Sequence, residues 1–589
     1  MPCVPCFSDS SQIGFRRGLA ACGLLFPRPA DWLLCMRTKV ICKLLFIGAA
    51  AASRADVAVL AQHNDPALTG ANLDETRLNV KNVNTNHFGL AWSLPVDDQI
   101  YAQPLVMTNV LIPAKGRHNL VLVATVNDSI YAFDADDPLA RQPYWQVSLL
   151  KPGVVPPRNA DMFGACSDFT DKYQDFSGNI GIVGTPVIDP ASSTIYLVAR
   201  TKEAGRLKPT FAQRLHALDV ATGAERPHSP VAITASCQGD GDGNINGLIE
   251  FDPLRQSQRA GLALIEGTVM IGWASHCDWR PYHGWLMGYD AHSLKRILLY
   301  NTTPDGSCGG IWMSGAPPSA DSEGNIYVAI GNGSVGVRGD PGDRLNRGES
   351  LVKLTRHADT LRVASWFTPW NWEGLEAGDI DFGSTGVLLI PGTRLALVGS
   401  KEGKLYLANR DHLGGMSRSN ADTNIVQSFQ VTDTEPPNNI HSTPVWWNGP
   451  SAAFAYVWGE SDYLRQYQFN QSAGRFLLPE VAKSPAPAPK GMPGGFLSLS
   501  ADGASAGTGI LWASHPSSGD ANRQTRPGIL HAYNAENVGE ELWNSEQNRG
   551  RDAVGNFAKF CPPTVANGKV YLATFSKRLD VYGLREPVH

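Results

Sequence analysis

The chain has 589 residues, of which 50 are Lys or Arg and 55 are Asp or Glu, and its formal net charge is −5. The basic residues are not clustered, which argues against a nucleic-acid-binding protein. With 59 Gly, 40 Pro, 15 Trp and 16 Tyr, the composition favours many short strands joined by turns.

The first segment of the chain is typical of an export signal. A basic stretch begins at Met36, an apolar run follows over residues 44–52, and small residues end it. This pattern predicts a Sec-type signal peptide over residues 36–55 and makes residues 1–35 an extension of the gene model. The apolar run is shorter than the roughly 20 residues that a membrane-spanning helix needs. We therefore expect a secreted or periplasmic mature protein that begins near Asp56 and has no membrane span.

The cysteines of the mature chain agree with export. Five remain after the predicted cleavage, so at most two disulfides form and one thiol is left over. The mature chain contains no CxxC zinc pattern and no CxxCH haem site, which excludes a c-type haem. The pairing of the five stays open at this point: Cys166, Cys237, Cys277, Cys308 and Cys561.

One sequence unit recurs eight times along the mature chain. It consists of an apolar strand often opened by Thr-Pro or Gln-Pro, a second strand, a tight turn, and a third strand that ends in Asp or Asn in most units. No amphipathic helix of ten or more residues interrupts the units. The third strands are expected at residues 130–134, 215–219, 286–290, 350–354, 405–409, 465–470, 530–534 and 578–582.

Eight such units predict an all-β fold, a single eight-bladed β-propeller of four-stranded antiparallel blades over residues 56–589. A single unit is too small to bury its own faces, so the units must pack on one another. The last unit supplies only three strands, and residues 89–95 (GLAWSLP) are available as the missing outer strand. An N-terminal strand that closes the ring in this way would leave no exposed sheet edge. Residues 482–490 (AKSPAPAPK) are expected to form an extended, solvated loop between blades six and seven.

Several motifs resemble those of a known family. The unit ALDVATGAE at residues 217–225 is similar to the repeat of pyrroloquinoline-quinone-type β-propellers. The runs at residues 309–333, 378–389 (GDIDFGSTGVLL) and 400–411 (SKEGKLYLANRD) resemble quinoprotein alcohol and methanol dehydrogenases and keep their order. The resemblance covers roughly residues 72–584. It implies an exported dehydrogenase of alcohols or sugars that depends on calcium and pyrroloquinoline quinone (PQQ); the alternative is a non-catalytic propeller that binds a protein or a glycan.

The resemblance also implies roles for cofactor-binding residues. Trp312 would be the floor on which the quinone stacks, and Lys401 would be the cation beside the quinone oxygens. Glu203, in ARTKEAG, and Asn332 would be calcium ligands, and both offer the hard oxygen atoms that calcium prefers. Calcium would polarise the quinone carbonyl as a Lewis acid.

The catalytic base implied by the resemblance is Asp379 or Asp381, which would accept the proton of the alcohol.

The positions of the predicted site residues favour a common location independently of the family. Each of them comes just before a first strand or just after a second strand, and these two points lie at the same end of an antiparallel pair. Taken singly, each residue also suits an ordinary role in a turn, a hairpin, a solvated loop or inter-blade packing. Jointly, they predict one site at one end of the ring, near the axis.

A further cluster, His276-Cys277-Asp278 with Tyr282 and His283, gathers metal-capable side chains after a second strand. A zinc site and a hydrogen-bonded loop are both compatible with it, and the loop is favoured.

Overall fold

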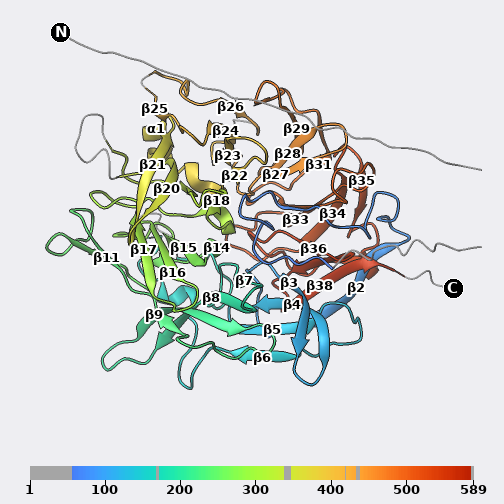
Figure 1. The fold of residues 1–589 in the computed structure, drawn as a ribbon, viewed down its shortest axis with the longest axis horizontal. Coiled ribbons are helices and arrows are strands. Elements are labelled where there is room, and N and C mark those ends of the chain that lie inside the picture. The colour runs from blue at the N-terminus through green and yellow to red at the C-terminus, as the bar shows by residue number, and fades with distance from the viewer. Residues whose placement is uncertain (1–55, 167–171, 337–345, 418, 433–437, 586–589) are drawn as a thin grey trace, which may run out of the picture. The chain divides into compact units, whose positions relative to one another are not determined.

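Eight antiparallel sheets follow one another along the chain and form blades around a common axis, as predicted (Figure 1). The computed structural model describes residues 56–166, 172–336, 346–417, 419–432 and 438–585. The predicted extension and signal peptide lie outside the described residues. Within them, the only α-helices are α1 (Trp372–Gly378) and α2 (Arg549–Asp552).

The first four blades contain the following strands. Blade one consists of β3 (Leu105–Ile112), β4 (Gly116–Ala124), β5 (Ser129–Asp134) and β6 (Trp145–Ser148), and blade two of β7 (Val187–Asp189), β8 (Thr194–Glu203), β9 (Thr210–Asp219) and β10 (Val231–Ala232). A separate pair, β11 (Ser236–Gln238) and β12 (Leu248–Glu250), precedes blade three, which has β13 (Gln256–Ser257), β14 (Ala263–Ile265), β15 (Thr268–Ser275), β16 (Trp285–Asp290) and β17 (Arg296–Asn301). Blade four has β18 (Ser319–Ala320), β19 (Ile326–Ile330), β20 (Ser350–His357), β21 (Thr360–Thr368) and β25 (Gly415–Met416).

The last four blades complete the ring. Blade five has β22 (Leu388–Leu389), β23 (Leu395–Gly399), β24 (Lys404–Asn409) and β26 (Gln427–Gln430). Blade six has β27 (Val445–Asn448), β28 (Ala453–Trp458), β29 (Tyr463–Asn470), β30 (Arg475–Phe476) and β31 (Ala482–Pro487). Blade seven has β1 (Ala71–Asn72), β32 (Phe496–Ser500), β33 (Ile510–Pro516), β34 (Gly528–Asn534) and β35 (Glu541–Asn544), and blade eight has β36 (Thr564–Ala566), β37 (Lys569–Ala573), β38 (Arg578–Leu584) and β2 (Phe88–Pro95).

The ring is closed by the strand that the sequence predicted. β2 pairs antiparallel with β38, from Phe88 opposite Leu584 to Pro95 opposite Arg578 (Figure 1). Blade eight therefore combines three C-terminal strands with one strand from near the start of the described chain. This pairing leaves β38 without an open edge.

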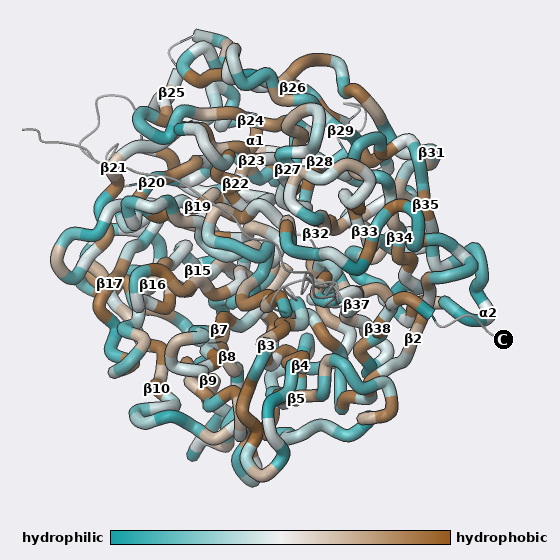
Figure 2. The backbone as a smooth tube through the Cα atoms, turned by 45° about the vertical axis from the view of Figure 1, so that its right-hand side comes forward, coloured by the Kyte–Doolittle hydropathy of each residue, from teal (hydrophilic) through white to brown (hydrophobic). Residues whose placement is uncertain are grey.

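Apolar side chains from neighbouring blades meet between the sheets. Figure 2 shows the apolar residues along the strands and the hydrophilic ones in the peripheral loops. Bulky side chains fill these layers, among them the fully buried Trp273, Trp447, Trp512 and Trp543. Burial of each large apolar side chain contributes at least about 1.5–3 kcal/mol to the free energy of folding. Packing between blades is therefore the main stabilising interaction of the ring.

The Pro-Ala segment is extended and largely exposed, as predicted, but it is a strand and not a loop. Residues 482–487 form β31, which pairs antiparallel with β29 at the outer edge of blade six. Proline is tolerated there because an edge strand has one side on which no N–H group is needed.

Residues 57–75, for which no element was predicted, run around the axis and bind the innermost strands; we call them the strap. Strap carbonyl oxygens accept hydrogen bonds, 2.8–2.9 Å long, from the N–H groups of Val106, Ile188, Ala320, Leu389, Trp446 and Leu499, in six blades. In blade eight, the side-chain amide of Asn72 donates to the carbonyl oxygen of Val565 at 2.9 Å. The strap thus satisfies main-chain groups that would otherwise lack partners.

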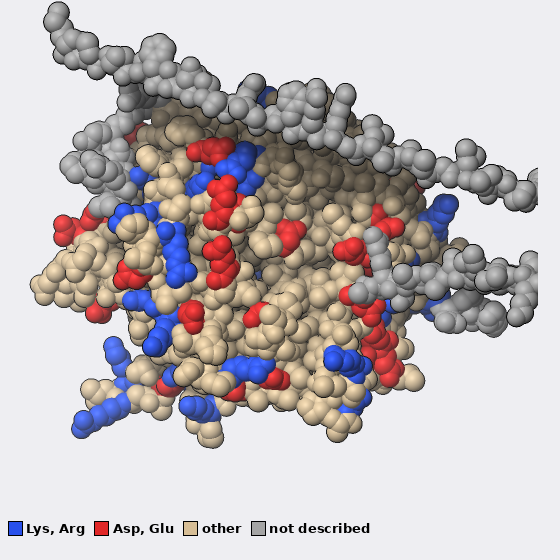
Figure 3. All heavy atoms as spheres, viewed as in Figure 1, with Lys and Arg blue, Asp and Glu red and all other residues tan. Residues whose placement is uncertain are grey.

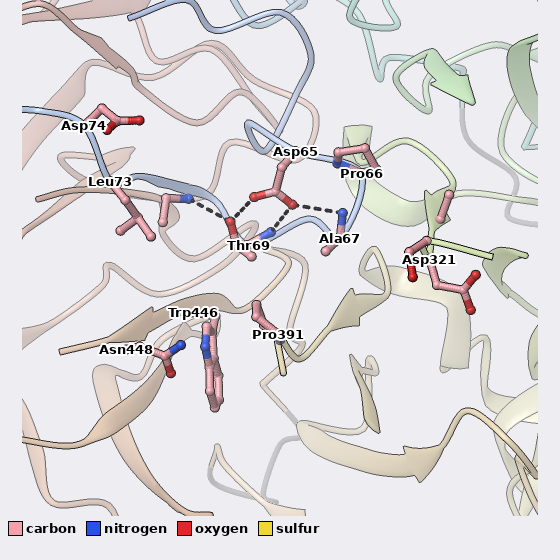
Figure 4. A pocket seen from close by; sticks show the side chains of 13 residues that line it. Asp65, Pro66, Ala67, Thr69, Leu73, Asp74, Asp321, Pro391, Trp446 and Asn448 are labelled. Atoms are coloured by element: carbon pink, nitrogen blue, oxygen red, sulfur yellow. Dashed lines mark hydrogen bonds between the residues drawn. The ribbon is translucent and has the colours of Figure 1, made fainter. Parts of the chain in front are cut away.

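A groove of about 600 Å³ lies between the strap and blades four to six (Figure 4). Asp65 holds the strap in its turn here, because its carboxylate accepts hydrogen bonds from the N–H groups of Ala67 at 2.9 Å and Thr69 at 3.3 Å. The groove is also lined by the turns between the first and second strands of these blades. It therefore lies at the end of the ring opposite the predicted site.

On the face shown in Figure 3, acidic and basic side chains are interspersed and other residues cover most of the surface. None of the helices in the described ranges is both long and apolar enough to cross a membrane.

Candidate active site

A cavity of about 200 Å³ opens at the end of the ring where second strands end and first strands begin. Four residues predicted for the site line it: Trp312, Asp379, Asp381 and Lys401. The loop that follows β19 adds Asn332, which bonds to both aspartates. Five of the six predicted residues thus come together, all from blades four and five.

Asp381 is the centre of the site. Its side chain is only 6% exposed and forms an ion pair with the ammonium group of Lys401. The main-chain N–H of Asn332 donates to Asp381 Oδ1 at 2.8 Å. Burial alone would lower the pKa of Lys401, but the charges of Asp381 and Asp379 outweigh it and raise that pKa above its ordinary value. Asp381 therefore holds two loops together through charge and hydrogen bonding.

Asp379 occupies a more open position, with 44% of its side chain exposed. Its Oδ1 lies 3.6 Å from Lys401 Nζ and accepts a long hydrogen bond, 3.4 Å, from the side-chain amide of Asn332. Burial raises the pKa of Asp379 to about 6; Lys401 opposes this shift and Asp381 adds to it. A carboxylate with this pKa beside a cavity can accept a proton near neutral pH.

Three further carboxylates surround this group. Burial, followed by the charges of Asp381 and Asp379, raises the pKa of Asp278 to about 7. Burial and the charge of Asp381 also raise the pKa of Glu349, which is fully buried and accepts the N–H of Phe382 at 2.6 Å. Burial likewise raises the pKa of Glu376. Carboxylates outnumber the cation Lys401, and such crowding is characteristic of functional sites.

Trp312 forms part of the cavity wall, but its indole ring is already in contact with another side chain. The guanidinium carbon of Arg259 lies 5.3 Å from the Trp312 ring centroid and 4.3 Å from that of Phe560. Trp312 was predicted to be the floor for a flat quinone. In the structure Arg259 lies over that ring instead.

Glu203 is not brought to the other five residues. It lies at the end of β8, where its carboxylate forms an ion pair with Arg214 at 2.5 Å and accepts the hydroxyl hydrogen of Thr201 at 2.9 Å. The hydrogen bond from Arg214 lowers the pKa of Glu203. Because β8 and β9 form a long hairpin that ends at Glu203 and Thr210, the carboxylate is satisfied within its own blade.

The His276-Cys277-Asp278 cluster forms a hydrogen-bonded loop, the alternative that the sequence favoured. Buried His276 bonds to Tyr173 through Nδ1 at 2.6 Å and to Arg200 through Nε2 at 2.5 Å. Cys277 forms a disulfide with Cys166 and lines the cavity. The other three cysteines of the described chain are free thiols.

The sequence analysis did not assign Arg259, Asp278 or Lys559 to the site. Each of the three occupies the same kind of strand-end position as the predicted residues. Asp278 follows a second strand, and Arg259 and Lys559 precede first strands. Asp278 belongs to the cluster already placed after a second strand, whereas Arg259 and Lys559 match no motif of the family. Position alone would have found all three.

The oxygen donors of the site are of the kind that binds a hard cation, but they supply only part of a coordination shell. Asn332 Oδ1 is buried without a hydrogen-bond partner, and the two aspartates beside it are oxygen ligands of the kind that calcium prefers. No group of three or more His, Cys, Asp or Glu side chains in the described part of the chain has an arrangement that could hold a metal ion. A quinone stacked on Trp312 does not fit while Arg259 lies over the ring.

Two solved structures that share the fold are dehydrogenases by name. The quinohemoprotein alcohol dehydrogenase from Comamonas testosteroni is 14% identical with a TM-score of 0.55, over 89% of this chain and 80% of that one. A europium-containing methanol dehydrogenase is 12% identical with a TM-score of 0.53, over 90% of this chain and 98% of that one. No protein-family model and no curated protein sequence matches the chain. At these identities the likeness shows that the chain shares the fold of these dehydrogenases.

Proposed function

We propose that the chain is an oxidoreductase of the quinoprotein type, which oxidises alcohols or sugars with PQQ and calcium as cofactors. The observation that carries the proposal is the meeting of Asn332, Asp379, Asp381 and Lys401 at one cavity beside Trp312. Ordinary structural roles do not require a lysine and several carboxylates with raised pKa values to share a cavity. The fold likeness to an alcohol dehydrogenase and a methanol dehydrogenase supports the same class.

In this proposal the cation would be held by Asn332 Oδ1 with Asp381, and Glu203 would take no part because it lies apart from these residues, in an ion pair with Arg214. If bound, the cation would supply Lewis acidity and PQQ would provide the electron-accepting group. Arg259 has to leave the face of Trp312 before a quinone can stack there.

Asp379, Lys401 and Asp381 have different roles in the proposed reaction. Asp379 accepts the proton of the substrate hydroxyl, since it is the more exposed aspartate and its pKa of about 6 keeps it mostly ionised at neutral pH. Lys401 stabilises negative charge on oxygen in the cavity. Asp381 positions Lys401 through the ion pair.

We also propose that the protein is exported through the signal peptide at residues 36–55 and works outside the cytoplasm. Sequencing of the N-terminus of the exported protein tests this. A start near Asp56 is expected, and residues 1–35 on the exported protein would contradict it.

The test of function is reconstitution of the purified mature chain with PQQ and CaCl₂. The absorbance of bound quinone should correspond to one PQQ per protein chain. The loaded protein should then oxidise alcohols and reduce an artificial electron acceptor. Asp379→Asn should retain the absorbance and lose turnover by about 10²-fold or more. Glu203→Gln should behave like the unmodified chain.

A second candidate, a non-catalytic propeller that binds a protein or a glycan, is favoured by the position of Arg259 over Trp312. Failure of the chain to bind the quinone at any calcium concentration would select this alternative.

A further inference from the structure

A smaller cavity of about 60 Å³ adjoins the proposed catalytic cavity, and Asp175, Arg259 and Trp312 line both. We call it the inner cavity. Its walls differ in character from those of the outer one. The outer cavity is rich in carboxylates, whereas the inner cavity is lined by two cations, Arg259 and Lys559, and a single carboxylate, Asp175.

Arg259 has hydrogen-bond donors without acceptors. Its guanidinium group contacts the rings of Trp312 and Phe560, and within the described ranges it makes no hydrogen bond and no ion pair. Its Nε atom is buried without a partner. A guanidinium group presents its N–H groups as a planar fork that matches the two oxygens of a carboxylate. The two rings therefore hold the guanidinium group in an orientation that can receive a carboxylate.

Lys559 is a second cation without a carboxylate in contact. It is 6% exposed, and its ammonium group donates to the main-chain carbonyl oxygens of Asp175, at 2.9 Å, and Asn522. Burial lowers the pKa of Lys559 to about 8; the charge of Asp175 opposes that shift and the charge of Arg259 adds to it. Buried cations are costly unless they are paired, so Lys559 would be stabilised by an anion in the cavity.

A third group completes a donor-rich wall. Ser275, at the end of β15, is fully buried, and its hydroxyl oxygen has no hydrogen-bond partner among the described residues. It lines the inner cavity together with the two cations. Unpaired buried polar groups are rare in folded proteins and require an explanation. A bound oxyanion would satisfy all three groups at once.

We propose that the inner cavity binds the carboxylate group of a small anionic alcohol, a hydroxy acid or sugar acid, through Arg259, Lys559 and Ser275. The small volume admits a carboxylate and little more. Because Arg259 and Trp312 also line the outer cavity, the rest of the ligand extends toward Asp379. The alcohol part of this inference rests on the proposed function, whereas the binding of the carboxylate does not.

The test compares glycerate with glycerol, which carries a CH₂OH group in place of the carboxylate. Binding to the purified mature chain without cofactor is measured by titration calorimetry at pH 7. Glycerate should bind at least about 10-fold more tightly than glycerol, a difference typical of one charge-assisted contact. Arg259→Met and Lys559→Met should each reduce this preference about 10-fold, and Lys81→Gln, at an exposed turn, should not. Equal binding of the two probes to the unmodified chain would overturn the proposal.

A measurement on the unmodified chain guards against variants that fail to fold. Glycerate binding should weaken as the pH rises above about 8, because Lys559 then loses its charge, while glycerol binding should not change. A glycerate affinity that stays constant through pH 10 would contradict the role of Lys559.

A carboxylate of PQQ is a second source of the same chemistry, so the titration is repeated after loading with PQQ and calcium. Retained glycerate binding assigns the inner cavity to the substrate, whereas its loss assigns the cavity to the cofactor and overturns the substrate proposal. If glycerate binds but the quinone does not, the proposed function fails and the anion site stands. If the quinone binds and glycerate does not bind even without it, only the anion site fails.

Discussion

Lys401 is bound to Asp381 through both its side chain and its main chain. The ammonium group forms an ion pair with Asp381 Oδ2, and the Lys401 N–H donates to the Asp381 carbonyl oxygen at 3.0 Å. Both residues lie in blade five, Asp381 before β22 and Lys401 after β23. The pair therefore fixes the two loops that carry the proposed chemistry, and it places the lysine among carboxylates with raised pKa values.

Lys401→Met should destabilise the protein more than Asp381→Asn does. Loss of the lysine leaves several carboxylates without a counter-charge and should cost about 3–5 kcal/mol, as breaking a buried pair usually does. Loss of Asp381 also relieves repulsion of Asp278 and Glu349, so its cost should be smaller. Urea unfolding at pH 8 measures the loss of unfolding free energy in both variants. The control is Lys404→Met, which removes an ion pair with Glu402 and should cost at most about 1 kcal/mol; a loss for Lys401→Met no larger than that would contradict the prediction.

Asp278 should make the protein less stable as the pH rises from about 4 to about 7. Its folded-state pKa of about 7 lies above the ordinary value, so over this range the folded state holds a proton that the unfolded state has released. Asp278→Asn should reduce proton uptake on folding by up to about one proton and flatten the dependence of stability on pH. Denaturant titrations at pH 5, 6, 7 and 8 test this. If the unfolding free energy of the variant depends on pH as steeply as that of the unmodified protein, the prediction is contradicted.

Reduction of the Cys166–Cys277 disulfide should loosen the wall of the outer cavity. The bond joins residues 111 apart in sequence, and closing so long a loop stabilises the fold by about 2–4 kcal/mol. Cys166→Ser should therefore lower the melting temperature and remove its sensitivity to dithiothreitol. Cys237→Ser, at a free thiol, should leave that sensitivity intact. A melting temperature of Cys166→Ser equal to that of the oxidised protein would contradict the prediction.

Removal of the strap and removal of the closing strand should have different effects. Deletion of residues 56–75 unpairs N–H groups of several innermost strands, each hydrogen bond contributing about 0.5–1.5 kcal/mol, so the melting temperature should fall while the protein stays soluble. Deletion of residues 56–96 also removes β2 and exposes the edge of β38, which should cause aggregation. Size-exclusion chromatography separates the two outcomes. Equal aggregation of both deletions would show that the strap, too, protects a sheet edge.

The repeats in the sequence were sufficient to predict the ring. Third strands such as residues 286–290 and 530–534 were found because each unit repeats the same alternation of apolar strands and turns, and the closing strand at residues 89–95 was found because the last unit lacked a partner. The Pro-Ala segment at residues 482–487 was correctly predicted to be extended and exposed, but its pairing as an edge strand was not, because composition does not reveal where an edge strand tolerates proline. The strap was missed for a similar reason, since its pairing with the innermost strands leaves no periodic pattern in its own residues.

For the site, the sequence predicted a common location but not the contacts. Strand-end positions placed Asn332, Asp381 and Lys401 together because antiparallel geometry brings such positions to one end of a blade. Only the tertiary structure decided that Glu203 pairs with Arg214 and that Arg259 lies over Trp312. Those outcomes depend on side-chain directions and on neighbours from distant parts of the chain. Hydrophobic periodicity encodes the backbone of a propeller locally, whereas the pairing of charges inside its cavities is set by packing in three dimensions.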